Sequence, residues 1–369
     1  MPSPPPIPLV DLAADHASLE PALTEAWHAT LTSSAFIGGE AVEAFEAAFA
    51  KTFGHQHVVS CANGTDAIEL ALEALGVGPG DEVVVPAMTW FSTAEAVATR
   101  GATPVCADVD PLTDGLSPAT VAPLVTDRTR AVIVVHLYGN PAHPKQLATF
   151  CEERGLALVE DCAQAHGARV GERHVGTFGA ISTYSFFPSK TLGCLGDGGA
   201  VVTQDPALAE TIRMLARHGQ RARHRHERWG RNSRLDALQA RVLSLKLPRL
   251  SGWIDLRNRH ADRYRALLDD VPGLALPPPA LPDHRHAYYV FAVRAARRDE
   301  LAAHLRARGI HTAVHYPTPI HHQPAYRGAT QQLPIAEQLG RQTLSLPLFP
   351  ALTEQQQDRV AREIKAFYA

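Results

Sequence analysis

Residues 181–202 read ISTYSFFPSKTLGCLGDGGAVV. The apolar runs at the two ends of this stretch predict strands at residues 181–186 and 199–203, joined by a loop with a single lysine, Lys190. An amine held among small, apolar and aromatic residues can lose its proton and attack a carbonyl carbon. The glycines that follow Lys190 let the backbone approach a bound group closely. From this stretch alone, an ordinary surface lysine on a glycine-rich loop explains the pattern equally well.

Outside this stretch, short apolar runs alternate with helical patterns. Such alternation predicts an α/β fold, in which a large, mostly parallel sheet is flanked by helices on both faces. In such a sheet ligands bind at the carboxyl ends of the strands, so the residues that follow each run are candidates for a site. The runs cover residues 57–60, 82–86, 103–109, 131–139 and 156–161, and the helices begin near Thr65, Ser92, Pro118, Pro144 and Pro206.

Composition and charge place the chain among ordinary globular proteins. Its 369 residues are enough for two domains, and a formal net charge of −3 gives no overall attraction to nucleic acid or anionic membranes. The five cysteines are odd in number and lack CxxC spacing, which disfavours a disulfide framework and favours a reducing compartment. No apolar run reaches the ~20 residues of a membrane span, and the N-terminus lacks a signal-peptide pattern. We therefore expect a cytoplasmic protein that binds neither nucleic acid nor a membrane.

Two candidate ligand contacts follow the first two strands. Asn63, Gly64 and Thr65 open a helix after the first run, and a helix N-terminus with free N–H groups is a natural seat for a phosphate. A simple helix cap explains the same residues. Trp90 lies beyond the end of the second run, where its ring could lie flat on an aromatic ligand. A core tryptophan is the alternative.

The run at residues 156–161 ends in two acidic residues, Glu160 and Asp161. A buried carboxylate is costly unless a cation or hydrogen-bond donors face it. Asp161 is therefore suited to hold a protonated ring nitrogen, and Gln164 can reach the edge of the same ligand. A Schiff-base lysine, an aspartate for a pyridine nitrogen and a helix N-terminus for a phosphate are the groups that pyridoxal 5'-phosphate requires. Together they predict a site for this cofactor.

Several blocks of the sequence together resemble the DegT/StrS family of nucleotide-sugar aminotransferases. The resemblance implies a type I, aspartate-aminotransferase-like fold, with a small α+β C-terminal domain beside the large sheet. It also implies a homodimer whose active sites are shared at the subunit interface. The blocks are NGTDAIELALEALGVGPGDEVVVP, VHLYGNPA, VEDCAQAHGA, SFFPSKTLGCLGDGGAVVT and GRNSRLDALQA, and the similarity runs from about residue 7 to residue 365.

The resemblance implies a role for each matched residue. Lys190 would hold the cofactor covalently, and Asp161 would pair with its pyridine nitrogen. Gln164 would contact the phenolic oxygen of the ring, and Trp90 would stack on the ring. The phosphate would be held by Gly64, Thr65, Ser185 and Asn232 of the partner subunit.

The reaction that the resemblance implies is a two-stage transamination. An amino acid, L-glutamate in most of the family, gives its amino group to the cofactor, and a nucleotide-linked keto-sugar then takes it up and leaves as an amino-sugar. Lys190, once freed, would move a proton between two carbon atoms as general base and then acid. Relatives with histidine at this position catalyse dehydration, so the lysine favours transamination.

The segment at residues 217–234, RHGQRARHRHERWGRNSR, holds seven arginines and one acidic residue, Glu227. We favour a loop that crosses to the partner's active site and meets a diphosphate, because guanidinium groups pair well with phosphate oxygens. A solvated surface loop is one alternative. A nucleic-acid patch is the other, and it is disfavoured because Trp229 is the single aromatic residue in the segment.

A long helical pattern at residues 234–268 leads out of the first domain, and Pro248 predicts a kink within it. We expect a large domain at residues 1–250, which includes an extended proline-rich N-terminal arm, and a small domain at residues 251–369. In the small domain we expect helices and strands, the strands at residues 286–295, 311–317 and 343–349.

Residues 315–326, HYPTPIHHQPAY, match a signature of the family's second domain. His315 and Tyr316 are therefore candidate sugar contacts, with buried strand-end packing as the alternative. The histidines of the chain show no convincing metal-ligand spacing, so we expect no metal site.

The motif NSRLDALQ resembles the branch of the family that acts on 3-keto hexoses more than the 4-keto branch. Phe187 departs from that branch, since several 3-keto enzymes carry a tyrosine there, whereas some relatives with phenylalanine act on uronic or N-acetylated sugars. Arg234 could pair with a sugar carboxylate, although a structural or diphosphate role fits equally well. A nucleotide-linked 3-keto hexose is thus the predicted acceptor. A 4-keto sugar or cyclitol is the first alternative, and a non-catalytic regulatory role is the second.

Overall fold

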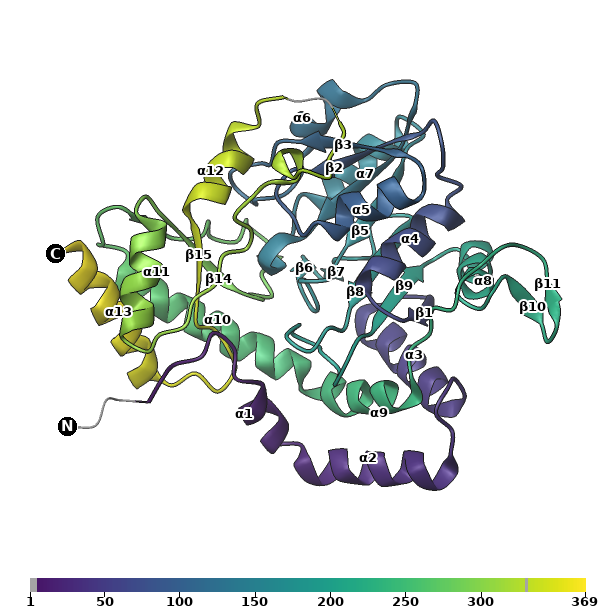
Figure 1. The fold of residues 1–369 in the computed structure, drawn as a ribbon, viewed down its shortest axis with the longest axis horizontal. Helices are drawn as coiled ribbons and strands as arrows, with labels where there is room; N and C mark the ends of the chain where they lie inside the picture. Colours follow the sequence, from purple (N-terminus) through teal and green to yellow (C-terminus); the bar gives the residue numbers. More distant parts are fainter. Residues whose placement is uncertain (1–4, 329–330) are drawn as a thin grey trace.

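The computed structural model describes residues 5–328 and 331–369, whose helices and strands are drawn in Figure 1. A seven-stranded sheet of order β1-β9-β8-β5-β4-β2-β3 forms its centre. β9 runs antiparallel to both of its neighbours, and the other strands pair in parallel, which confirms the predicted mostly parallel sheet. The strands are β1 (His57–Cys61), β2 (Glu82–Pro86), β3 (Thr103–Ala107), β4 (Thr129–Val135), β5 (Ala157–Asp161), β8 (Ile181–Ser185) and β9 (Gly199–Thr203).

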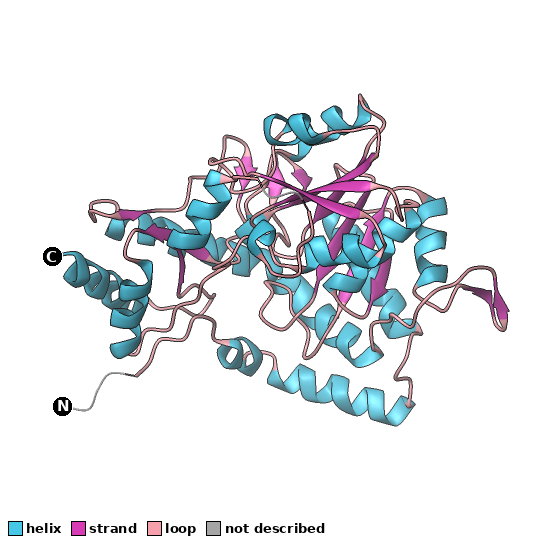
Figure 2. Cartoon of the chain, turned by 45° about the horizontal axis from the view of Figure 1, so that its top comes forward, coloured by secondary structure: helices cyan, strands magenta, loops and turns pink. Residues whose placement is uncertain are grey.

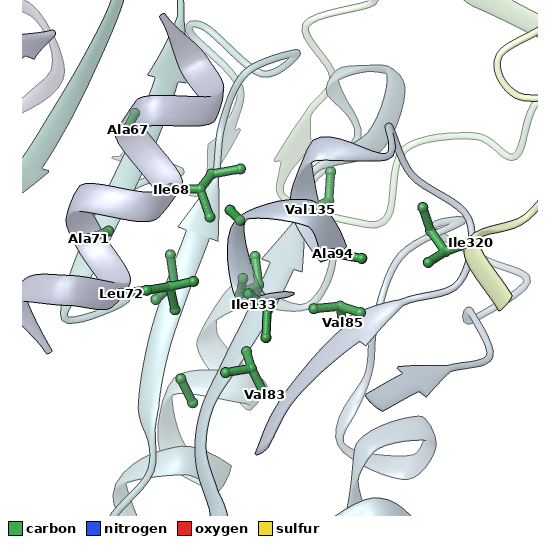
Figure 3. Close-up of a cluster of buried hydrophobic side chains, with 14 of the residues drawn as sticks. Ala67, Ile68, Ala71, Leu72, Val83, Val85, Ala94, Ile133, Val135 and Ile320 are labelled. Carbon is green, nitrogen blue, oxygen red and sulfur yellow. The ribbon is translucent and has the colours of Figure 1, made fainter. Parts of the chain in front are cut away.

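Helices cover both faces of this sheet, because successive side chains of a strand point to opposite faces and both sets are apolar. One face is covered by α4 (Gly64–Ala74), α5 (Ser92–Thr99) and α8 (Pro206–Leu215), and the other by α3 (Glu40–Phe53), α6 (Pro118–Val121), α7 (Pro144–Glu152) and α9 (Ala237–Lys246). Val83 and Val85 pack on the first face, whereas Val84 between them packs on the second. Figure 3 shows the first cluster, in which Ile68 of α4 lies with Val83 and Ile133 of the sheet.

The N-terminal segment packs against the C-terminal part of the chain. The N–H of Ile7 donates to the carbonyl of Gly309 over 2.8 Å, and Ile7 pairs with Ile310 in a single parallel bridge. The first four residues of the predicted proline-rich arm lie outside the described residues. Two helices follow, α1 (Leu12–Ala17) and α2 (Glu20–Ser33), and α2 lies along the outer edge of the molecule in Figure 1.

A smaller antiparallel sheet of order β12-β14-β15 forms beyond the long helix α10 (Leu250–Leu268). The kink expected at Pro248 is present as a 3₁₀ turn, Leu247–Arg249, between α9 and α10. The sheet packs against α10, α11 and α13, so the predicted small α+β unit is confirmed. Its remaining elements are β12 (Leu274–Ala275), β14 (Phe291–Ala295), α11 (Arg298–Ala307), β15 (Thr343–Leu346) and α13 (Glu354–Tyr368).

The prediction of one strand in this part of the chain is wrong. Residues 311–317 form only a single bridge, between Ala313 and Ser345, in place of a strand. Pro317 lacks an N–H group and so cannot continue a ladder. The segment instead runs to a 3₁₀ turn, η4 (Ile320–His322), where the N–H of Ile320 donates to the carbonyl of Ala87 over 2.8 Å. The division of the chain at residue 250 stays a prediction.

The remaining elements are short. The hairpin of β10 (Gln220–Ala222) and β11 (Arg225–His226) projects from the body of the protein, as the two views in Figures 1 and 2 show. A third small sheet joins β13 (His284–Arg285), β6 (Arg169–Val170) and β7 (Arg173–His174), and α12 (Pro334–Gln342) packs on the first face of the large sheet. Within the described part of the chain, no helix is both long and apolar enough to cross a lipid bilayer.

Candidate active site

Lys190 lies in the loop that follows the carboxyl end of β8. Its N–H donates to the carbonyl of Phe187 over 2.8 Å, and its Nζ lies 4.8 Å from the centroid of the Tyr289 ring. The side chain is half-buried. The amine therefore faces an aromatic ring, which argues against a solvated surface lysine.

Asp161 ends β5, the strand next to β8, and is 5% exposed. Its Oδ1 accepts the N–H of Ala163 over 3.0 Å, and its Oδ2 lies 3.5 Å from Oγ1 of Thr93. Burial raises the pKa of Asp161, although the Ala163 N–H and the charge of Lys190 act in the opposite direction. Among the described residues, no arginine or lysine forms an ion pair with this carboxylate. Its oxygens can thus accept a cationic group of a ligand.

Glu160 is turned toward the protein interior, where its carboxylate is satisfied. Three backbone N–H groups within residues 176–179 donate to it over 2.7–2.8 Å, and Nε2 of His136 lies 3.1 Å away. Nδ1 of His136 accepts the N–H of Ala142, so Nε2 carries the proton. Burial acts to raise the pKa of Glu160, but the hydrogen bonds from His136 and from the backbone N–H groups lower it overall. Of the two acidic residues, Asp161 is therefore the one available to a ligand.

The start of α4 and the end of β8 form a concave seat. Gly64 and Thr65 are the first helical residues, and their N–H groups have no partner within the helix. Oδ1 of the N-cap residue Asn63 accepts the N–H of Asp66 over 2.8 Å. A Cβ atom on Gly64 would lie 2.8 Å from Cβ of Ser185, so only glycine fits here without a shift. Asn63 therefore caps the helix, and the N–H groups of Gly64 and Thr65 stay free of helical partners in a position suited to bind a phosphate.

Gln164, Tyr316 and Trp90 line one side of this region. Oε1 of Gln164 accepts the N–H of Tyr138 over 2.7 Å, and its Nε2 donates to the hydroxyl of Tyr316 over 3.1 Å. The ring centroid of Trp90 lies 5.4 Å from that of Tyr316. Trp90 is 57% exposed, so it is not a core residue.

His315 and Phe187 flank the same region. Nδ1 of His315 lies 2.8 Å from Oγ of Ser345, and Tyr138 donates its hydroxyl proton to the carbonyl of His315. Burial, and then the charge of Lys190, lower the pKa of His315 to about 4, so its imidazole is neutral near pH 7. Phe187 is 51% exposed beside the Lys190 loop. The predicted sugar contact of His315 stays a prediction.

Among the described residues, neither Asn232 nor Arg234 forms a hydrogen bond or an ion pair with Lys190 or Asp161. Asn232 pairs with Arg217 in a backbone bridge, and Arg234 lines a separate surface cavity of about 290 Å³. Both residues are exposed. Their predicted contribution to the site of a second subunit stays a prediction.

The arginine-rich segment is anchored at its base and open at its tip. Arg231 forms ion pairs with Glu69 and Glu73 of α4, the second over 2.9 Å. Arg221 pairs with Glu210 over 2.6 Å, whereas the ring of Trp229 is 95% exposed. The arginine-rich segment is therefore held on α4, the helix that Gly64 and Thr65 open.

Two histidines meet a carboxylate that sequence spacing did not indicate. Nε2 of His321 and of His322 lie 3.5 and 3.8 Å from Oε1 of Glu337. That oxygen also accepts the N–H of Leu333 over 3.2 Å, and Arg341 lies 3.7 Å from the other oxygen. Ordinary hydrogen bonds and ion pairs account for this cluster, and the expectation of no metal site stays a prediction.

Sequence reasoning missed Tyr289, Thr93 and Tyr138. Tyr289 lies under Lys190, and its hydroxyl is 3.2 Å from Oγ of Ser189. All three lie in apolar runs or ordinary helix starts, so no local pattern marks them. Tertiary contacts place them, as where the N–H of Tyr289 donates to the carbonyl of Tyr138 over 2.8 Å.

Comparisons with known proteins agree with this geometry. The sequence profile of the DegT/DnrJ/EryC1/StrS aminotransferase family matches residues 18–365. The chain is 45% identical over 366 residues to a dTDP-3-amino-3,4,6-trideoxy-alpha-D-glucose transaminase of Streptomyces venezuelae, covering 98% of this chain and 96% of that protein. It is 43% identical over 366 residues to a Geobacillus stearothermophilus protein named pleiotropic regulatory protein, covering 98% of each.

A solved structure gives the same result for the fold. The crystal structure of DesV from S. venezuelae, in complex with a ketimine intermediate, matches with a TM-score of 0.96 at 44% identity and covers 99% of both chains. The predicted family resemblance and the predicted fold class are confirmed.

Proposed function

Because the chain belongs to the DegT/DnrJ/EryC1/StrS aminotransferase family, we propose that it moves an amino group from L-glutamate to a nucleotide-linked 3-keto sugar. The enzyme class, a transaminase that depends on pyridoxal 5'-phosphate, follows from the family. The 3-amino sugar in the name of the S. venezuelae relative supports the keto position, as does the NSRLDALQ motif. A 4-keto sugar or a cyclitol is the alternative acceptor.

The residues around Lys190 fit this cofactor. The observation that carries the proposal is that Lys190 and the buried Asp161 lie at the carboxyl ends of adjacent parallel strands, and that no ion pair in the described part of the chain involves Asp161. A carboxylate in that setting suits a protonated pyridine nitrogen. The seat between Gly64 and Ser185 suits the phosphate. When bound, the cofactor supplies an electron sink for negative charge at a substrate carbon.

Each side chain then has a defined task. Asp161 would hold the ring nitrogen in its protonated form, Gln164 would hold the ring oxygen, and Trp90 would stack on the ring. Lys190 holds the cofactor and later moves a proton at the substrate carbon as base and then acid. The phosphate is held by Gly64, Thr65 and Ser185, and the sugar is met by Phe187, His315, Tyr316 and Arg234.

We further propose that two subunits complete each site. Asn232 of the partner subunit would reach the phosphate, and the arginine-rich hairpin would reach the substrate diphosphate. Support comes from apolar side chains on and after α2 that the single chain leaves exposed. They are Trp27, Leu31, Phe36 and Ile37, each 48–52% exposed.

Absorption spectroscopy of the purified protein with pyridoxal 5'-phosphate tests this function. We expect a visible band from the lysine-bound cofactor that disappears on addition of L-glutamate and returns on addition of the correct keto-sugar. A Lys190→Ala variant should lack the band. A band that survives in this variant would refute the role of Lys190, and a band that never responds to glutamate would favour a non-catalytic role.

A further inference from the structure

Lys246, at the end of α9, is a buried cation that none of the tasks above uses. It is 3% exposed, and its Nζ donates to the carbonyl of Gly193 over 2.7 Å. The same Nζ lies 3.1 Å from Nε2 of His16 in α1. Among the described residues, no carboxylate lies within ion-pair distance of Lys246. Burying an ammonium group without an ion pair is costly, so the hydrogen bond from Lys246 to the Gly193 carbonyl calls for a structural reason.

Gly193 closes the turn that carries Lys190. A Cβ atom on Gly193 would lie 2.3 Å from the carbonyl oxygen of Pro188 and 2.7 Å from that of Phe187, so the turn folds back on itself. The N–H of Lys190 donates to the same Phe187 carbonyl, and that of Cys194 donates to Phe186 over 2.8 Å. The turn is therefore closed by its own backbone, and the Gly193 carbonyl connects it to α9.

We propose that Lys246 is a positioning residue for Lys190. Its charged hydrogen bond fixes the turn at Gly193 relative to α9 and so holds the amine of Lys190 over the ring of Tyr289. Through His16, the same ammonium group also connects the N-terminal helix α1 to this turn. The inference rests on the proposed role of Lys190 as the lysine that binds the cofactor.

Three variants separate positioning from general stability. Lys246→Met removes the charge and the donors at similar length, and Lys246→Arg retains both. Arg249→Met is the matched control, because Arg249 joins the same region to α1 by donating to Oγ of Ser18 over 3.0 Å. Arg249 forms no hydrogen bond with the turn at Gly193 among the described residues, so its loss should leave Lys190 in place.

The measurements are the rate of cofactor release from the holoenzyme into an excess of a trapping apoprotein, and the pH titration of the visible band. We expect Lys246→Met to release the cofactor about tenfold faster and to shift the midpoint of the titration, because a charged hydrogen bond to a buried group is lost. Lys246→Arg should recover most of the release rate, and Arg249→Met should match the unmodified protein.

Two results would overturn the inference. One is that Lys246→Met lowers the melting temperature but leaves the release rate and the titration as in Arg249→Met. If Lys246→Met does not fold, Lys246→Gln takes its place, because it keeps an amide donor without the charge. An unchanged rate of cofactor release in Lys246→Gln would be the second result that overturns the inference. A missing band in the unmodified protein, or one retained in Lys190→Ala, would instead refute the proposed function.

Discussion

Nε2 of Gln164 donates a hydrogen bond to the hydroxyl of Tyr316 over 3.1 Å, which joins the loop after β5 to the segment before η4. Oε1 of the same amide accepts the N–H of Tyr138, so the orientation of the amide is set at both ends. Since Gln164 lies three residues after Asp161, this bond brings the C-terminal part of the chain to the edge of the proposed cofactor site.

Replacing Tyr316 by phenylalanine removes this one hydroxyl. We expect the Michaelis constant for the keto-sugar to rise roughly fivefold, because a net hydrogen bond contributes about 1 kcal/mol and the Gln164 amide loses its restraint. Steady-state kinetics with both substrates checks this. An equal effect in the half-reaction with glutamate alone would show that Tyr316 acts on the cofactor and not on the sugar.

Adding a methyl group at Gly64 should damage the phosphate seat. The new Cβ of Gly64→Ala would lie 2.8 Å from Cβ of Ser185, and overpacking of this kind costs about 1–3 kcal/mol. We expect weaker cofactor binding and a less stable apoprotein. In the double variant with Ser185→Gly, urea unfolding should show recovered stability, whereas titration with pyridoxal 5'-phosphate should still show weak binding. Recovery of both would contradict a phosphate contact by Ser185.

Truncating Trp90 separates stacking on a ligand from packing in the core. Trp90 is 57% exposed, so we expect Trp90→Ala to lower the free energy of unfolding of the apoprotein by less than about 1 kcal/mol, against the 3–5 kcal/mol typical of a core aromatic. The dissociation constant of the cofactor should rise by about fivefold, since ring stacking contributes about 1 kcal/mol beyond the burial of apolar area. Fluorescence titration of the apoprotein measures it. Unchanged affinity would remove Trp90 from the site.

The buried His166 should make the protein sensitive to acid. Neither ring nitrogen has a hydrogen-bond partner among the described residues, and burial, aided by the charge of Lys190, lowers the pKa of His166 to about 3. The unfolded chain takes up this proton near pH 6.5, whereas the folded state resists it. Stability is therefore complete above pH 6.5 and falls as the pH drops toward 3, by up to about 1.4 kcal/mol per pH unit.

Urea unfolding at several pH values tests this linkage. Between pH 7 and pH 5 the stability of His166→Phe should fall less steeply than that of the unmodified protein. His28→Phe is the control for the substitution itself, because His28 lies exposed on α2. Equal slopes in all three proteins would show that His166 is protonated in the folded state.

Local sequence patterns were enough to predict the fold class of this chain. Apolar runs short enough for strands alternate with helical patterns, so the sheet and its covering helices could be predicted before any contact was known. The prediction of a strand at residues 311–317 was wrong. Its apolar residues suit a strand, but Pro317 and the hydrogen bond of Ile320 to Ala87 direct the backbone away from the sheet. Tertiary hydrogen bonds outweighed local preference there.

Sequence by itself determined the fold class and the family. It also predicted Lys190 and Asp161 as site residues, because each stands out from an apolar neighbourhood by its chemistry. Only the tertiary structure decided that the Glu160 carboxylate accepts hydrogen bonds from His136 and backbone N–H groups, while the Asp161 carboxylate remains available to a ligand. It also placed Tyr289 under Lys190 and Lys246 against Gly193. These pairings depend on strand order and helix docking, and those come from packing between residues far apart in the chain.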